Sequence, residues 1–395
     1  MMKNKKIAFF IDSLGGGGAE RVVSVLSTEL SAKGYDIDIL LLTKRPVAYS
    51  LPTQINLLYA QDMPVTSRWG KFTRMLLEKC MHLQVRFWNP LLRKFGCNTY
   101  PRVNETRMHF YANYALPYRE YLKKNPGCTA FGFLIRSNIS MLMAAKGLPV
   151  KTVFCERNNP VRPDMPTNIL RIRDKISRRC KAAVFQTEDE RNYYTWLKCP
   201  AAVIPNPLKE VLPEPFTGKR RHEIVNFCRL NKQKNIPLLI DAFERLLRDY
   251  PEYTLRIYGR GEEKENLIAL TQDKGLGASV FFEDFAMDIH DRIRDCAMFV
   301  CSSDYEGLSN SMLEAMAIGM PCVCTDCDGG GARMMIDDHK NGILVSKGDA
   351  HALYLGMKEL VESPDLAEAL SREAANVRQT LNLSAIADRW EAMIG

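Results

Sequence analysis

Short apolar runs alternate with amphipathic segments along most of the chain. The run "KIAFFI" over 6–11 predicts a buried strand, and "AERVVSVLSTELSAKG" over 19–34 predicts a helix with Gly34 just past its end. The next apolar run, "DIDILLL" over 36–42, predicts a second strand. The apolar positions of the helix between them share one face: Val22, Val25, Leu26 and Leu30. Such alternation indicates an α/β fold, a parallel sheet with helices on both faces.

The pattern is interrupted once and then starts again. Residues 205–222, "PNPLKEVLPEPFTGKRRH", hold four prolines and a glycine and are typical of a linker. Apolar runs and helical segments resume at 223, and 395 residues suit two domains better than one core. We therefore expect two doubly wound, Rossmann-like domains that bind a ligand between the carboxyl ends of their strands. The predicted organisation is a first domain over 1–207, a second over 208–375, and a last helix over 376–395 that packs back toward the first.

The net charge of +8 is unevenly distributed. Residues 1–200 carry 32 Lys and Arg against 15 Asp and Glu, whereas residues 201–395 carry 22 against 31. The basic half points to an anionic partner, either nucleic acid or an anionic membrane. Apolar runs stay shorter than a membrane span needs, and the five-residue run before Asp12 is too short for a signal peptide. We expect a cytoplasmic protein.

The 12 cysteines are scattered, and a cytoplasm would keep them reduced. "CVCTDC" over 322–327 has neither paired CxxC spacing nor a following His at finger spacing. The sequence therefore favours a buried strand there over a zinc site.

Four glycines follow the first predicted strand in "DSLGGGGAER", residues 12–21. A glycine-rich turn that leads into a helix is suited to a phosphate, because it offers backbone N–H groups and a positive dipole end. The dinucleotide pattern G-x-G-x-x-G fails, since its last glycine would fall at Glu20. The sequence thus predicts a phosphate contact here without a dinucleotide.

Two carboxylates and two cations lie near predicted strand ends in the second half. Glu306 precedes a predicted helix capped by Ser309 or Asn310, and Glu314 falls in its second turn. The N–H groups of Gly307, Leu308, Ser309 and Asn310 could then meet a diphosphate and sugar hydroxyls. Arg229 and Lys234 could neutralise a leaving diphosphate without a metal. Taken alone, the same residues also fit a capped surface helix and a solvated basic loop.

Seven motifs spread from end to end resemble retaining glycosyltransferases of family four, which have the GT-B fold. Those motifs are "GGAERVV" (17–23), "CERNNP" (155–160), "VIPNPL" (203–208), "RLNKQKN" (229–235), "IYGRGEE" (257–263), "EGLSNSMLEAMAIGMPCV" (306–323) and "NGILV" (341–345). The resemblance covers most of the chain but not residues 45–115. It implies a nucleotide-sugar donor, no metal or other cofactor, and transfer with retention at the anomeric carbon.

The resemblance also implies roles for individual residues. Arg229 and Lys234 would hold the donor diphosphate, Glu306 the transferred sugar and Glu314 the ribose. Gly307, Leu308, Ser309 and Asn310 would contact sugar or phosphate, and Gly17 and Gly18 would reach the donor phosphate from the first domain. The residues expected on the acceptor side are Arg157, Asn158, Asn138 and Arg21. Arg157 occupies a position that is often His in the family.

Residues 68–95 carry an apolar stripe at helical spacing beside seven Lys and Arg and one acid. This pattern is typical of a helix in a membrane interface, although a helix packed on its own domain would show a similar stripe. "GGAER" and "ERNNP" resemble relatives that use UDP-sugars to extend lipid-diphosphate-linked sugars. We therefore expect a peripheral enzyme on the inner face of the cytoplasmic membrane. It would transfer a hexose or N-acetylhexosamine to a lipid-linked or glycan acceptor in surface polysaccharide assembly, with no nucleic acid partner.

Two other interpretations remain open. A sugar-nucleotide 2-epimerase of the same fold would turn over its donor without an acceptor. A non-catalytic carbohydrate- or nucleotide-binding protein would tolerate the loss of Glu306.

Overall fold

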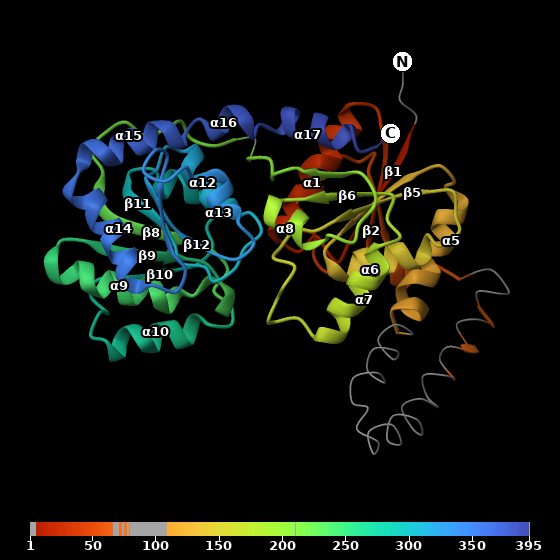
Figure 1. The fold of residues 1–395 in the computed structure, drawn as a ribbon, viewed down its shortest axis with the longest axis horizontal. Helices are drawn as coiled ribbons and strands as arrows, with labels where there is room; N and C mark the ends of the chain where they lie inside the picture. Colours follow the sequence, from red (N-terminus) through yellow and green to blue (C-terminus); the bar gives the residue numbers. More distant parts are fainter. Residues whose placement is uncertain are drawn as a thin grey trace. The chain divides into compact units, whose positions relative to one another are not determined.

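The computed structural model describes residues 5–65, 71–72, 75–76, 79, 109–209 and 211–394. These residues form two compact units, each with its own sheet (Figure 1). Unit 1 comprises Met1–Phe185, Arg191–Ile204 and Ile386–Gly395, and unit 2 comprises Gln186–Glu190 and Pro205–Ala385.

Unit 1 contains a seven-stranded parallel sheet in the order β3-β2-β1-β4-β5-β6-β7 among the described residues. The strands are β1 (Lys6–Ile11), β2 (Asp36–Leu41), β3 (Asn56–Tyr59), β4 (Thr129–Phe133), β5 (Lys151–Cys155), β6 (Ala182–Phe185) and β7 (Ala201–Val203). The helices are α1 (Gly18–Ala32), η1 (Ala60–Asp62), η3 (Tyr111–Ala115), α5 (Leu116–Lys124), α6 (Ile135–Ala144), α7 (Thr167–Ser177), α8 (Glu188–Tyr193, which begins in unit 2) and α17 (Leu383–Glu391, which also begins there).

Strand β1 is buried on both faces, which explains its unbroken apolar sequence. Phe10 points to the face covered by α5 and meets Tyr118 edge-on at 4.7 Å between ring centroids. Phe9, on the opposite face, stacks on Phe131 at 5.4 Å. The fully buried Trp390 of α17 contacts Phe131 from that same side. The last turns of the chain therefore complete the core of unit 1.

Unit 2 contains a six-stranded parallel sheet in the order β10-β9-β8-β11-β12-β13. The strands are β8 (Arg221–Phe227), β9 (Thr254–Tyr258), β10 (Val280–Glu283), β11 (Cys296–Cys301), β12 (Cys322–Asp326) and β13 (Ile343–Ser346). The helices are η4 (Lys232–Lys234), α9 (Ile236–Asp249), α10 (Lys264–Asp273), α11 (Ile289–Ile293), α12 (Asn310–Ala317), α13 (Gly331–Met335), α14 (Ala350–Glu362), α15 (Pro364–Ala374) and α16 (Val377–Thr380).

Each sheet reverses its strand order at one point. In unit 1 the reversal lies between β1 and β4, and in unit 2 it lies between β8 and β11. Loops that leave the carboxyl ends of such neighbouring strands diverge, and ligands of open α/β sheets bind in the crevice between them. The α/β prediction of two doubly wound parallel sheets is confirmed.

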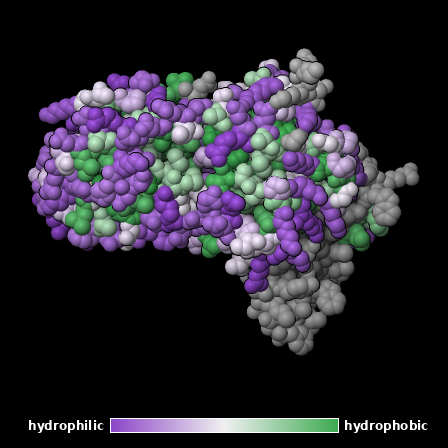
Figure 2. Space-filling model, turned by 45° about the horizontal axis from the view of Figure 1, so that its top comes forward, coloured by the Kyte–Doolittle hydropathy of each residue, from purple (hydrophilic) through white to green (hydrophobic). Residues whose placement is uncertain are grey.

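Polar side chains predominate on the visible face of unit 2, with apolar ones scattered among them (Figure 2). Phe285 and Met287, in the loop between β10 and α11, are 61% and 80% exposed. Within the described ranges, no helix combines the length and the apolar character needed to cross a bilayer.

Candidate functional site

Lys234 and Glu306 meet at the strand-order reversal of unit 2. Lys234 ends η4 in the loop after β8, and Glu306 lies in the loop after β11. The Lys234 Nζ contacts Glu306 Oε1 as an ion pair. The same carboxylate accepts hydrogen bonds from Gln233 Nε2 at 3.0 Å and from Ser303 Oγ at 3.0 Å. Glu306 is therefore an ordered carboxylate held by three donors.

The pair fixes the charge of Lys234. Burial of the ammonium group lowers its pKa, but the nearby Glu306 carboxylate outweighs that effect, and the net pKa of Lys234 is raised. The lysine is therefore protonated at neutral pH. Its three N–H donors allow it to bind Glu306 and a further anion together. Arg229 is exposed just beyond the carboxyl end of β8, where a second cation could meet the same anion.

Glu314 lies in α12 and is only 6% exposed. His290, from α11, approaches its Oε2 with Nε2 at 2.8 Å. An ionised carboxylate only accepts hydrogen bonds, so Nε2 carries the proton in this contact. Ser309 caps α12 by accepting a hydrogen bond from the Met312 N–H at 3.4 Å, which is one of the two caps that the sequence suggested.

The loop Gly307–Asn310 is held by side chains from distant segments of unit 2. Gln186 Oε1 accepts from the Leu308 N–H at 3.3 Å, and Gln186 Nε2 donates to Asn206 Oδ1 at 2.9 Å. Asn206 Nδ2 donates in turn to Asn310 Oδ1 at 2.7 Å. The Leu308 N–H and the Asn310 side chain therefore already have protein partners and act in shaping the loop.

Gly331 lets a second loop close against this one. A Cβ at Gly331 would lie 1.9 Å from the Gly307 carbonyl oxygen, which no side chain could tolerate. Gly331 is the first residue of α13, so the start of this helix packs directly against the Gly307 backbone. This contact explains why position 331 is a glycine.

In unit 1, the glycine-rich turn lies between β1 and α1. The Gly17 N–H donates to Glu20 Oε2 at 2.6 Å, and Ser13 donates to the other oxygen of Glu20. Arg21 donates its backbone N–H to the Gly17 carbonyl at 2.9 Å as α1 begins. Gly18 is the first residue of α1. A phosphate at this helix terminus would have to share it with the Glu20 carboxylate.

The acceptor-side candidates are largely buried within unit 1. Asn138 is 1% exposed, and its Nδ2 donates to the Cys155 carbonyl at 2.9 Å. Arg157 is 6% exposed and lies over the Trp390 ring at 5.5 Å. Asn158 Oδ1 accepts from the Asn159 N–H at 2.8 Å. In this conformation Asn138 and Arg157 support the ends of β5 and α17.

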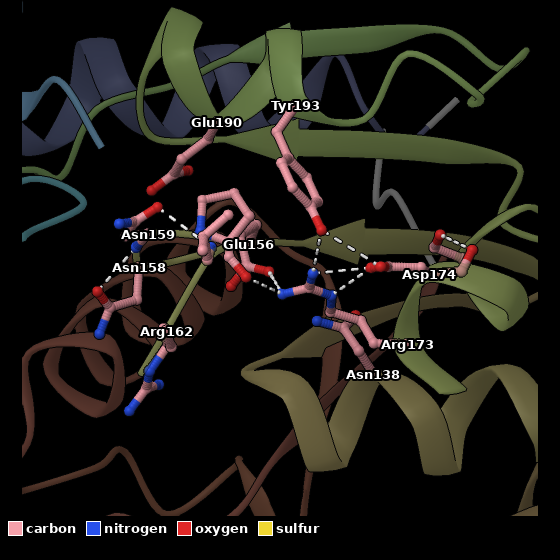
Figure 3. A network of polar contacts seen from close by, with 12 residues as sticks. Asn138, Glu156, Asn158, Asn159, Arg162, Arg173, Asp174, Glu190 and Tyr193 are labelled. Atoms are coloured by element: carbon pink, nitrogen blue, oxygen red, sulfur yellow. Dashed lines mark hydrogen bonds and ion pairs between the residues drawn. The ribbon is translucent and has the colours of Figure 1, made fainter. Parts of the chain in front are cut away.

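A buried polar network fixes the loop that follows β5, which carries "ERNNP" (Figure 3). Arg173 has no exposed side chain surface and lies 3.6 Å from Glu156. It donates to the Pro160 carbonyl at 2.7 Å and to Tyr193 Oη at 3.2 Å. Asp174 is bound to the same guanidinium at 2.7 Å. The network therefore holds both ends of the Glu156–Pro160 loop.

No group of three or more His, Cys, Asp or Glu side chains is placed to hold a metal ion in the part of the chain that the structure describes. Cys322 and Cys324 lie in the buried strand β12, as the sequence favoured.

Five side chains that contact the site were not found from the sequence: Gln186, Asn206, Gln233, His290 and Ser303. Asn206 lies in the recognised motif "VIPNPL" and Gln233 in "RLNKQKN". Their place in these motifs is the sequence feature that could have marked them as site residues. Gln186, His290 and Ser303 stand outside any quoted motif.

Residues 213–377 match the family model described as glycosyl transferases group 1. The chain is also 27% identical, with 94% of each chain covered, to the Campylobacter jejuni N-acetylgalactosamine-N,N'-diacetylbacillosaminyl-diphospho-undecaprenol 4-alpha-N-acetylgalactosaminyltransferase.

Two solved structures show the same fold at low sequence identity. A variant of S. aureus TarM, in complex with fondaparinux, alpha-GlcNAc-glycerol and UDP, superposes with a TM-score of 0.74 at 14% identity, covering 99% of this chain and 100% of that one. Anabaena HepE in complex with UDP and glucose superposes with a TM-score of 0.73 at 16% identity, covering 98% of this chain and 99% of that one. The family-model match and the C. jejuni relative show that the chain is a transferase enzyme, a glycosyltransferase, and the two solved structures show that its fold is GT-B.

Proposed function

We propose that the protein is a retaining, metal-independent glycosyltransferase of family four. It transfers a hexose or N-acetylhexosamine from a UDP-sugar to a lipid-diphosphate-linked or glycan acceptor in surface polysaccharide assembly. The observation that carries the proposal is the Lys234–Glu306 pair at the strand-order reversal of unit 2. It puts a fixed cation and a fixed carboxylate at the position where such sheets bind ligands.

Each charged group then has a chemical task. Lys234 and Arg229 stabilise the negative charge that develops on the leaving diphosphate. Glu306 binds sugar hydroxyls and places negative charge near the anomeric carbon, where positive charge develops. Glu314 accepts hydrogen bonds from the ribose diol. Cations that do this need no divalent metal, which is why we propose that none takes part.

The nature of the acceptor is supported by the relatives and by charge. The C. jejuni relative is named for transfer onto a diphospho-undecaprenol-linked sugar. The basic segment 68–95 lies almost entirely outside the described residues, but five of its positions are described: Lys71, Phe72, Met75, Leu76 and Lys79. All five are helical and exposed, and three of them are large and apolar. We include docking on the cytoplasmic face of an anionic membrane in the proposal.

The test is a transfer assay with purified full-length protein. UDP-, GDP- and ADP-sugars would be offered with and without a short-chain polyprenyl-diphosphate glycan, and Glu306→Gln would serve as the inactive control. We expect UDP release that depends on the acceptor, and a product whose anomeric configuration by NMR matches the donor. An inverted product would contradict retention, and donor turnover with 2-epimer formation in the absence of acceptor would indicate an epimerase.

A further inference from the structure

His290 forms a buried pair with Glu314 that no recognised motif accounts for. The two side chains are 6% and 8% exposed, and they come from α11 and α12, separated by 24 residues in the chain. The His290 ring also meets Phe227, at the end of β8, edge-on at 5.9 Å between centroids. The ring is thus held between the strand-order reversal and the carboxylate.

We infer that His290 is a positioning residue for the nucleotide site: its Nε2–H fixes the Glu314 carboxylate in the orientation that accepts hydrogen bonds from a ribose diol. The inference rests on the proposed function, because it assigns the ribose to Glu314. His290 itself touches no substrate in this scheme.

The physical reason is the geometry of a carboxylate. A Glu side chain has several rotatable bonds, and ordering it on binding costs free energy. The bond from His290 engages Oε2, so the plane of the carboxylate is set before a ligand arrives. A carboxylate has about four lone-pair positions, so the bond from His290 to Oε2 does not by itself engage the second oxygen.

Three variants separate this role from a packing role. His290→Phe keeps a ring against Phe227 but removes the donor. His290→Gln restores an N–H donor within reach of Glu314. His222→Phe is the matched control. His222 is exposed, stacks on the Tyr253 ring and lies at the start of β8, whereas Phe227, which contacts His290, lies at the end of that strand.

The measurement is the Kd of UDP by calorimetry on the full chain, with Tm recorded alongside and KM and kcat for the sugar donor where transfer is seen. Loss of a hydrogen bond to a charged group lowers ligand affinity by about tenfold or more. We expect His290→Phe to raise the Kd of UDP and the donor KM about tenfold while kcat changes less, and His290→Gln to recover most of the loss. His222→Phe should leave all three values unchanged.

A double-mutant cycle with Glu314→Gln completes the test. If His290 acts through Glu314, adding His290→Phe to Glu314→Gln should weaken UDP binding little further. Additive losses, or a His290→Phe protein with lowered Tm and unchanged Kd, would overturn the inference. A parent that binds UDP but transfers no sugar would overturn the proposed function alone, and a parent that binds no UDP would overturn both.

Discussion

Lys234 and Glu306 are bound to each other across the strand-order reversal of unit 2, although each is expected to act on a different part of the donor. Gln233, next to Lys234 in η4, donates to the same carboxylate. Under the proposed roles, one coupled pair would contact both the diphosphate and the sugar. A change to either member should affect both binding and turnover, in different proportions.

Glu306→Gln should lower turnover more than donor binding. The amide keeps the shape and leaves the cation in place, but it removes negative charge beside a developing oxocarbenium ion. We expect kcat to fall about 100-fold or more, with a much smaller change in donor Kd. Steady-state kinetics and calorimetry on the same preparation would check this. A variant that binds donor poorly but turns over normally at saturation would contradict the assignment.

Lys234→Met should weaken donor binding as well as turnover, because the ammonium group meets the diphosphate before and after bond cleavage. A charge-assisted bond of about 1.5–3 kcal/mol corresponds to a 10- to 100-fold rise in Kd. Lys232→Met, at an exposed lysine of the same short helix, is the matched control. Equal effects of the two variants would show that general basicity, not the paired lysine, matters.

Turnover should persist in EDTA. In the proposed function, Lys234 and Arg229 supply the positive charge at the leaving diphosphate, so removal of divalent cations should leave kcat within about twofold. The assay would follow UDP release after dialysis against EDTA. Complete loss of turnover, restored by Mg²⁺ or Mn²⁺, would refute metal independence.

Arg173→Met should destabilise unit 1 strongly. The guanidinium is buried with Glu156, and removing one partner of a buried pair costs about 3–5 kcal/mol. The loop Glu156–Pro160 would lose its bond to the Pro160 carbonyl at the same time. Denaturant unfolding followed by fluorescence would measure the change. Arg171→Met, exposed on the same helix, should have little effect. An equally small loss of stability in Arg173→Met would show that the network is dispensable.

The fold could be predicted because its signal is local. Buried parallel strands such as β1 and β11 read as short apolar runs, and the helices between them carry one apolar face. Linker prolines near 205–215 marked the end of the first alternation. Strand order is a different matter: which runs lie side by side depends on long-range pairing, which periodicity does not encode.

The same limit applies to the site. Lys234 and Glu306 could each be assigned a role from the motif around them, but their direct contact depends on β8 and β11 being neighbours. His290 stands in "MDIHD" with nothing in the local sequence that points to Glu314. The engagement of the Leu308 N–H by Gln186 likewise depends on a side chain 122 residues away.

The first 200 residues should dock on an anionic membrane. They carry 32 basic and 15 acidic residues, and Phe72, Met75 and Leu76 are exposed apolar side chains. Each Lys or Arg near an anionic surface contributes about 1 kcal/mol, and salt screens this attraction within a Debye length. Insertion of apolar side chains adds a contribution to the binding free energy that salt does not remove. Liposome binding should therefore require acidic lipid and should weaken, without vanishing, as salt rises.

The test compares two charge-reversal variants in liposome co-sedimentation. Changing Arg68, Lys71, Arg86 and Arg93 to Glu should abolish binding, while UDP affinity stays intact because Lys234 and Glu314 belong to unit 2. The matched control reverses four exposed basic residues of unit 2 and should still bind: Lys219, Arg245, Arg248 and Arg372. Equal binding by the first variant and the parent, or a parent that ignores acidic liposomes at low salt, would assign the segment to ordinary packing and favour a soluble acceptor.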